Sequence, residues 1–185
     1  MSDALAIAAR EGLPEEFRAL LETYPRAGWR EHPNFSDLTA FWLDRHAMFR
    51  EVLARMQSAT QMHMAATEVR FGPEIARYTG FFLNQLHEHH GVEDHYYFPK
   101  LRKFDFRLVR AFEMLDADHH ALDAEIDRLA AATNAVLDDL RAGRAGEPGR
   151  LLQAQEGFER FLVRHLEDEE DVIMPVILKY APEIG

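Results

Sequence analysis

The spacing of apolar residues along the chain is that of amphipathic helices. Leu38, Phe41, Trp42, Arg45 and Phe49 give the spacing of the first long segment, and the next has a similar stripe that includes Ile75, Phe82 and Leu86. No run shows the strict alternation of a half-buried strand bounded by turn residues. The pattern therefore predicts an all-α protein.

Capping residues, glycines and prolines place the ends of the expected elements. A capping pair at Ser36-Asp37, the break at Gly72-Pro73 and the loop over residues 143–149 separate the helical stretches. Pro99 should kink or end the second of them. We expect four long helices over about residues 37–66, 73–98, 106–140 and 151–174, and a single helical turn after Pro175.

Short connections between long helices are typical of an up-down-up-down four-helix bundle. We assign this bundle to residues 36–180 and a tail to residues 181–185. Residues 1–35 form an N-terminal extension, which glycines and prolines break into short irregular and helical pieces, with one helix expected from Pro14 to about Thr23.

The net charge, the length of the apolar runs and the cysteine content each exclude some kinds of binding partner or metal site. The formal net charge of −11 argues against a nucleic-acid partner. No apolar run approaches the ~20 residues that span a bilayer, so no membrane association is expected. The first residues lack the pattern of a signal peptide, and a cytoplasmic location is the default expectation. The absence of cysteine excludes disulfides and thiolate metal sites.

A repeated motif carries the candidate chemistry. His89 and Glu93 are followed after five residues by Pro99, and His165 and Glu169 are followed after five residues by Pro175. A His and a Glu four residues apart lie on one face of a helix, about 6 Å apart along its axis. Two such pairs in one small domain suggest a site for two metal ions.

Each motif has a partner histidine on the preceding helix of its hairpin. His46 precedes His89 by 43 residues, and His119 precedes His165 by 46 residues. If the hairpins pack around an approximate two-fold axis, the four histidines converge and the two glutamates bridge two metals. Asp123 shares a face with His119 and is either an extra ligand or a hydrogen-bond partner of a ligand imidazole. The predicted ligands are His46, His89, Glu93, His119, Asp123, His165 and Glu169.

The ordinary alternative for each residue is structural. A lone histidine on an apolar face, such as His46, is usually a core residue, and a single His-x-x-x-Glu is a weak motif. Helix geometry turns His90 about 100° from His89, which suggests that it supports a ligand or is partly exposed. The same geometry turns Glu170 about 140° from His165 and so favours Glu169. Burying four imidazoles and two carboxylates without a metal would leave costly polar groups, which favours the metal site.

Imidazole and carboxylate ligands without sulfur suit iron, whereas manganese and zinc fit less distinctively. A structural zinc site normally closes with four ligands. Six or seven nitrogen and oxygen ligands fit a di-iron centre better.

These segments together resemble the hemerythrin family, specifically its hemerythrin-like HHE cation-binding domain. The resemblance covers about residues 36–180 and implies two iron ions with an oxo or hydroxo bridge in a four-helix bundle. Two positions depart from hemerythrin proper: Asp123 stands where a second histidine is expected, and the family spacing would select Glu170 rather than Glu169. The likeness is carried by Asp44-Arg45-His46, His89-His90-Gly91-Val92-Glu93-Asp94 with Phe98-Pro99, Asp118-His119-His120-Ala121-Leu122-Asp123 and His165-Leu166-Glu167-Asp168-Glu169-Glu170.

The resulting expectation is a di-iron protein that binds or senses dioxygen, nitric oxide, peroxide or iron itself, and a binding protein rather than a committed enzyme. Two alternatives stay open: a di-iron oxidase or peroxidase, and a sensor or interaction module with a structural metal. Ferritin-like enzymes use Glu-x-x-His, and no histidine here follows a glutamate at that spacing. The expected ligand is a small diatomic molecule or peroxide, and a protein partner or homo-oligomer stays open.

Overall fold

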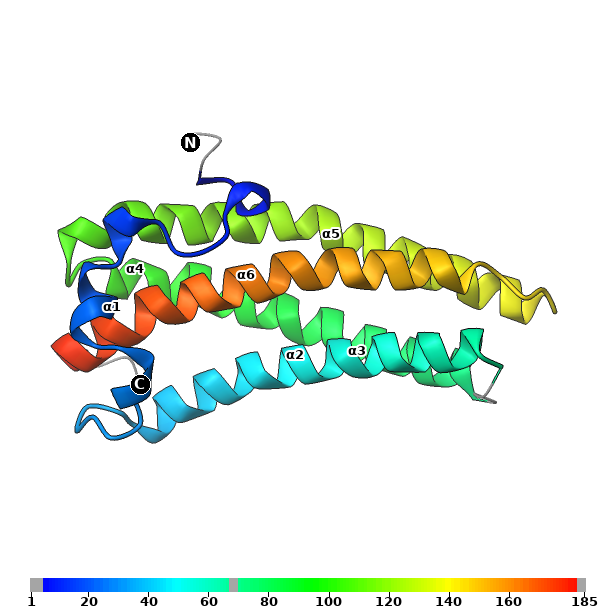
Figure 1. Cartoon of the computed structure of the whole chain (residues 1–185), viewed down its shortest axis with the longest axis horizontal. Helices are drawn as coiled ribbons and strands as arrows, with labels where there is room; N and C mark the ends of the chain where they lie inside the picture. Colours follow the sequence, from blue (N-terminus) through cyan, green and yellow to red (C-terminus); the bar gives the residue numbers. More distant parts are fainter. Residues whose placement is uncertain (1–4, 67–69, 183–185) are drawn as a thin grey trace. The chain divides into compact units, whose positions relative to one another are not determined.

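The computed structural model describes residues 5–66 and 70–182 (Figure 1). Within these residues the chain is helical and has no strand, which confirms the all-α prediction. The first four residues of the expected extension and the last three of the expected tail lie outside the described residues. The helices are η2 (Ile7–Ala9), η3 (Glu15–Phe17), α1 (Ala19–Thr23), η4 (Arg26–Gly28), α2 (Asp37–Met64), α3 (Phe71–Val92), η5 (Glu93–Tyr97), α4 (Phe98–Leu101), η6 (Phe106–Leu108), α5 (Val109–Arg141) and α6 (Pro148–Tyr180).

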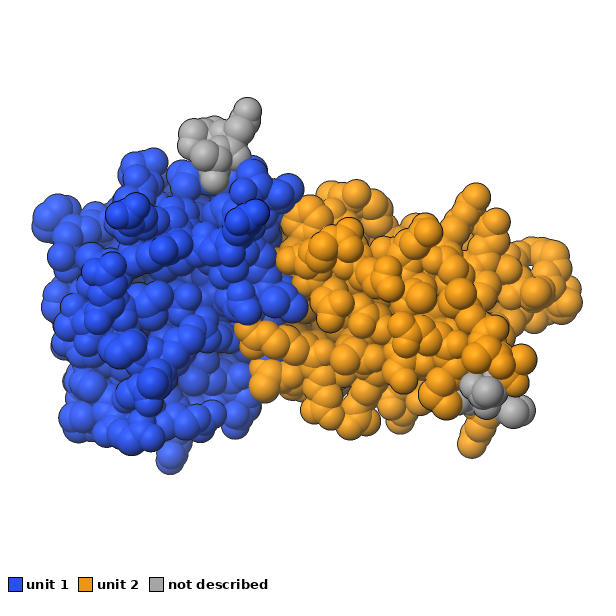
Figure 2. All heavy atoms as spheres, in the orientation of Figure 1, with its two compact units in different colours: residues 1–46, 89–120, 163–185 blue, residues 47–88, 121–162 orange. Residues whose placement is uncertain are grey.

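The chain divides into two compact units, coloured separately in Figure 2. Each of the four long helices contributes one stretch to each unit. Unit 1 comprises Met1–His46, His89–His120 and Val163–Gly185, and unit 2 comprises Ala47–Glu88 and Ala121–Leu162.

Unit 1 holds an apolar cluster of buried side chains, and the N-terminal extension contributes to it. Phe17, Leu20 and Trp29 are buried in this cluster together with residues of α4, α5 and α6. The extension consists of short helical pieces, as expected, with η3 and α1 in place of a single helix from Pro14 to Thr23. Its own apolar residues, rather than regular structure, attach it to unit 1.

Within each unit, the stretch of α2 runs antiparallel to the helical stretch that follows it in the chain. In unit 1, Trp42 contacts Glu93 and His46 contacts His89. Residue numbers therefore increase along α2 while they decrease along the facing stretch of α3 and η5, which is an antiparallel arrangement. In unit 2, Phe82 of α3 makes edge-to-face contacts with Phe49 of α2 and Phe158 of α6, at ring-centroid distances of 6.0 and 5.5 Å. All three rings are fully buried, so they form an aromatic part of the core of unit 2.

The two prolines of the repeated motif behave differently. Before Pro99 the α-helix ends at Val92 and passes through the π-helical turn η5, and Pro99 occupies an early position of α4 where a missing N–H is tolerated. The prediction that the last helix ends at Met174 is wrong, because α6 continues through Pro175 to Tyr180. A proline inside a helix costs about 3 kcal/mol. The next turn buries Val176, Ile177 and Leu178, each worth roughly 1.5–3 kcal/mol, and this outweighs the cost.

The packing of the extension makes a testable prediction. Phe17 is 3% exposed, so Phe17→Ala should lower the free energy of unfolding by about 3–5 kcal/mol. The matched control is Phe41→Ala, since Phe41 is 61% exposed and its loss should cost less than about 0.5 kcal/mol. Urea unfolding followed by circular dichroism measures both, and equal small effects would show that the extension is not packed against unit 1.

Candidate metal centre

Side chains able to bind a metal ion lie inside unit 1 in two groups, each with its ligating atoms within 4.8 Å of one another. They come from four of the long stretches of helix and from the π-helical turn η5. The His46 group contains His46, His89, Glu93 and Glu169, and the His119 group contains His90, His119 and His165.

In the His46 group two imidazoles meet edge to edge. His46 Nε2 lies 3.0 Å from His89 Nε2 and 3.4 Å from Glu169 Oε2. His89 Nε2 lies 3.1 Å from Glu93 Oε1, which also accepts a hydrogen bond of 2.8 Å from the indole N–H of Trp42. The Trp42 ring packs on His46 with centroids 4.2 Å apart, so it covers one side of this group.

The His119 group contains three imidazoles. His119 Nε2 lies 3.0 Å from His165 Nε2. The ring of His90 stacks on His119, with centroids 4.0 Å apart and planes within 12°. His90 Nε2 is buried and has no hydrogen-bond partner among the described residues, so its lone pair is available to this group.

The two glutamates lie between the groups. Glu93 contacts His89 through Oε1, and its Oε2 lies 3.8 Å from His119 Nε2. Glu169 Oε2 lies 3.4 Å from His46 Nε2 and 3.6 Å from His165 Nε2. Each carboxylate therefore faces one imidazole of each group, which is the position of a ligand that bridges two ions.

The outer nitrogens of three of these histidines face carboxylates. His46 Nδ1 lies 3.1 Å from Glu170 Oε1, and His119 Nδ1 lies 2.7 Å from Asp94 Oδ1. His165 Nδ1 lies 3.5 Å from Asp118 Oδ2, which is an electrostatic contact, and it has no hydrogen-bond partner among the described residues. A carboxylate behind the outer nitrogen of an imidazole directs the lone pair of the other nitrogen inward, as in known metal sites.

The π-helical turn η5 begins at Glu93. Glu93 is fully buried, while the next residue, Asp94, reaches the outer nitrogen of His119. Turns of this kind occur frequently at functional sites.

Burial sets the charge of these groups. It lowers the pKa of His89 to about 2, with a further contribution from neighbouring imidazoles, and the pKa of His165 to about 4. Burial also raises the pKa of Glu93 and of Glu169, and the facing Glu93 adds to the rise at Glu169. At neutral pH the imidazoles of His89 and His165 are neutral, which is the form that binds a metal.

The donor set fits a metal pair. His119 Nδ1 lies 2.7 Å from Asp94 Oδ1, and its Nε2 faces His165 Nε2 at 3.0 Å, so the inner nitrogens of two imidazoles converge on one point. Glu93 Oε2 and both carboxylate oxygens of Glu169 are buried without a hydrogen-bond partner among the described residues. Each such atom costs about 1–3 kcal/mol, which a cation bound between the groups would offset.

The structure brings together six of the seven predicted ligands: His46, His89, Glu93, His119, His165 and Glu169. It does not bring Asp123 to them, because that side chain is exposed and belongs to neither group of the described residues. Glu170 approaches the outer nitrogen of His46, and Glu169 approaches the inner nitrogens.

Sequence reasoning missed His90. On a helical wheel His89 stands at 0°, Glu93 at about 40° and His90 at about 100°, so Glu93 lies between the two histidines. Centring the wheel on His89 turned His90 away from the site. Centring it on the buried Glu93 places one histidine on each side, as observed.

The family of the chain follows from its similarity to known sequences. The model of the hemerythrin HHE cation-binding domain matches residues 37–177. The chain belongs to this family. The hemerythrin-type domain is a cation-binding domain, and the two groups above are its candidate ligands in this chain.

No curated protein and no solved structure matches the chain. Among the described residues, no helix is both long enough and apolar enough to cross a membrane.

The buried carboxyl pair predicts an unusual pH dependence. The folded pKa of Glu169 lies above its unfolded value, so in metal-free protein this residue costs stability as the pH rises through that interval. Glu169→Gln should raise the free energy of unfolding of the metal-free protein at pH 8 by about 1 kcal/mol or more, with little change at pH 4. The same substitution should weaken metal binding.

The control is Glu156→Gln, an exposed acid on the same helix that should change neither quantity. Urea unfolding after treatment with a chelator measures the stability. A Glu169→Gln protein that is less stable than the wild type at pH 8 would contradict this account of the carboxyl pair.

Proposed function

We propose that the protein binds two iron ions between the His46 and His119 groups, bridged by Glu93 and Glu169, and that this di-iron centre binds a small ligand. The observation that carries the proposal is the position of the two carboxylates, each of which faces an imidazole of both groups. We further propose that the four long helices form an up-down-up-down bundle, which the antiparallel contacts of α2 with α3 and η5 support.

The ligand set favours iron over a structural zinc ion. It contains five imidazole nitrogens and two carboxylates and no sulfur, which exceeds the four ligands of a structural zinc site. When bound, an iron pair would supply reversible one-electron chemistry to small ligands such as dioxygen, nitric oxide or peroxide. The residues of the chain hold the ions, exclude water and fix the imidazole orientations.

The two groups differ in the number of imidazole nitrogens that they offer, and this difference indicates where a small ligand would bind. The His119 group offers three imidazoles and the His46 group offers two. The side with fewer protein ligands is therefore the proposed position of the small molecule. Trp42 packs on His46 and donates to Glu93, so it borders this position.

An apolar pocket adjoins Trp42. Its lining is almost entirely aliphatic and aromatic, so it favours a small uncharged molecule over a charged substrate. This supports dioxygen or nitric oxide as the ligand class. The pocket is lined by Leu38, Thr39, Trp42, Tyr97, Leu101, Ile173 and Ile177.

Iron stoichiometry tests the proposal, with His90 as the sharpest probe. Wild-type protein loaded with ferrous iron without air and then oxidised should retain two irons per chain and absorb in the near ultraviolet as a bridged pair does. His90→Ala should lose at least one of the two irons, because it removes one of three imidazoles from the His119 group.

The control is His120→Ala, since the neighbouring His120 is exposed and belongs to neither group. It should retain both irons. One tightly held zinc ion in the wild type, or two irons and an unchanged spectrum in His90→Ala, would contradict the proposed centre.

A second prediction concerns access to the proposed ligand position. Trp42→Ala removes both the ring that covers His46 and the hydrogen bond to Glu93. We expect the reduced protein to be oxidised by air about tenfold faster, from the loss of a hydrogen bond to a charged group. Stopped-flow absorbance measures this rate.

Trp42→Phe keeps an aromatic cover and removes only the hydrogen bond, so it separates the two contributions. The matched control is Phe158→Leu, a change at a fully buried aromatic residue of unit 2 that belongs to neither group and should leave the rate unchanged. Equal oxidation rates in Trp42→Ala and wild type would remove Trp42 from the proposed access route.

A further inference from the structure

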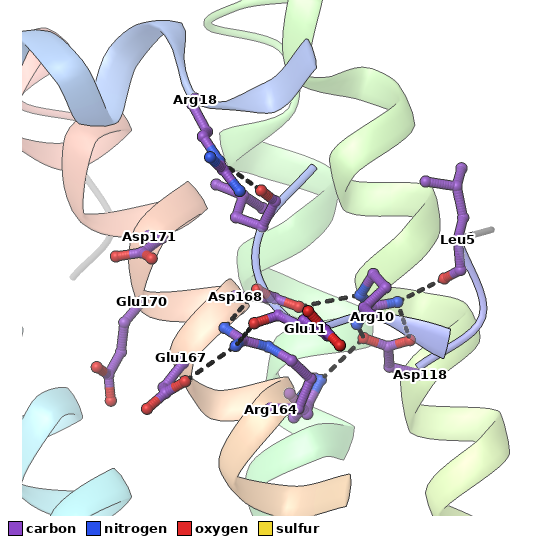
Figure 3. A network of polar contacts seen from close by, with 12 residues as sticks. Leu5, Arg10, Glu11, Arg18, Asp118, Arg164, Glu167, Asp168, Glu170 and Asp171 are labelled. Carbon is purple, nitrogen blue, oxygen red and sulfur yellow. Dashed lines mark hydrogen bonds and ion pairs between the residues drawn. The ribbon is translucent and has the colours of Figure 1, made fainter. Parts of the chain in front are cut away.

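The segment of residues 5–29 precedes the family-matched region. It is attached to the rest of unit 1 by buried charged contacts as well as by its apolar residues. The Arg10 side chain is 2% exposed, and its guanidinium contacts Asp118 and Asp168 (Figure 3). Nε donates to Asp168 Oδ2 at 3.0 Å, Nη1 donates to Asp118 Oδ1 at 3.0 Å, and Nη2 donates to Asp118 Oδ2. One arginine of the extension thus joins α5 to α6.

Both carboxylates held by Arg10 stand next to proposed ligands in the sequence. Asp118 precedes His119, and Asp168 precedes Glu169. Asp118 Oδ2, which Arg10 binds, also lies 3.5 Å from His165 Nδ1. The order from outside to inside is therefore arginine, carboxylate and imidazole of the His119 group.

Arg26 of the same segment begins a similar series at the His46 group, in which an arginine contacts a carboxylate and the carboxylate contacts an imidazole. Its Nη1 lies 2.6 Å from Glu170 Oε2, and Glu170 Oε1 lies 3.1 Å from His46 Nδ1. Arg26 also donates to Asp171 Oδ1 at 2.6 Å and to the carbonyl of Glu167 at 2.9 Å. Two arginines of one segment therefore lie behind one histidine of each group.

We propose that residues 5–29 form a tuning segment of the metal centre, in which Arg10 and Arg26 act as positioning residues for His165 and His46 through Asp118 and Glu170. The inference rests on the proposed function. A carboxylate at the outer nitrogen of an imidazole increases the electron donation of its inner nitrogen. An arginine on that carboxylate draws the negative charge away, weakens the donation and favours the reduced metal.

A purely structural role is the alternative. Two buried carboxylates such as Asp118 and Asp168 require a counter-charge, and Arg10 supplies it whatever the site contains. Arg26 distinguishes the two explanations, because its own side chain is 43% exposed although that of Glu170 is 7% exposed, and its loss leaves Arg10 in place as the fully buried counter-charge. A structural role at this position predicts no change at the metal, whereas the tuning role does.

Linkage supplies a test that needs no variant. If the docked segment favours the reduced metal, reduction of the bound metal must favour the docked segment to the same degree. Hydrogen exchange of backbone amides over residues 5–29 should therefore be slower in reduced than in oxidised iron-loaded wild type. Equal exchange in the two states would overturn the coupling.

The variant test uses Arg26→Gln in the full-length protein loaded with two irons. Its reduction potential, measured by spectroelectrochemical titration, should fall below that of the wild type, and Arg26→Lys should restore part of the loss. Arg10→Gln should shift the potential in the same direction if it folds. If it does not fold, Arg26→Gln alone decides.

The matched control is Arg110→Gln, which breaks a 3.4 Å ion pair between α5 and Glu16 of the tuning segment without touching a carboxylate of the site. Its potential should equal that of the wild type. Two retained irons with an unmoved potential in Arg26→Gln would overturn this inference and leave the metal site standing. A wild type that holds no iron would overturn both.

Discussion

The burial of two carboxylates among five imidazoles is the constraint on which the rest of unit 1 depends. Glu93 and Glu169 are fully enclosed, and three of their four carboxylate oxygens have no hydrogen-bond partner among the described residues. In the metal-free chain this costs stability, because each buried carboxyl must keep its proton or remain unpaired. Two divalent cations between the groups would reverse the sign of that cost. The buried carboxylates therefore favour the binding of cations between the two groups.

Charged groups lie in layers around this interior. Around the proposed cations lie Glu93, Glu169 and the imidazoles, then the outer carboxylates, and then arginines. Asp118, Asp168 and Glu170 form the acidic layer, and Arg10, Arg26 and Arg164 face it. Arg164 also donates to the carbonyl of Glu11, so it fastens the segment that carries Arg10 (Figure 3). The extension is thus a component of the charge balance as well as of the apolar core.

The helices and most of the candidate ligands could be predicted from the sequence, because both depend on the local spacing of residues. Apolar spacing defined four long helices, and the repeated His-x-x-x-Glu pointed to six side chains that the structure brings together. Other features depend on contacts between distant segments. The wheel centred on His89 turned His90 away, and Pro175 seemed to end a helix that three buried residues continue. Arg10 stood in an irregular segment, where no periodicity could indicate that it binds Asp118 and Asp168. Asp123, which the spacing favoured as a ligand, lies exposed.

The most direct test of the central claim is a crystal structure of the iron-loaded protein with anomalous diffraction recorded at the iron edge. The account predicts two iron peaks in unit 1, one ligated by His46 and His89 and the other by His90, His119 and His165, with Glu93 and Glu169 bridging them. A single peak, or two peaks with His90 unbound and Asp123 in its place, would contradict it.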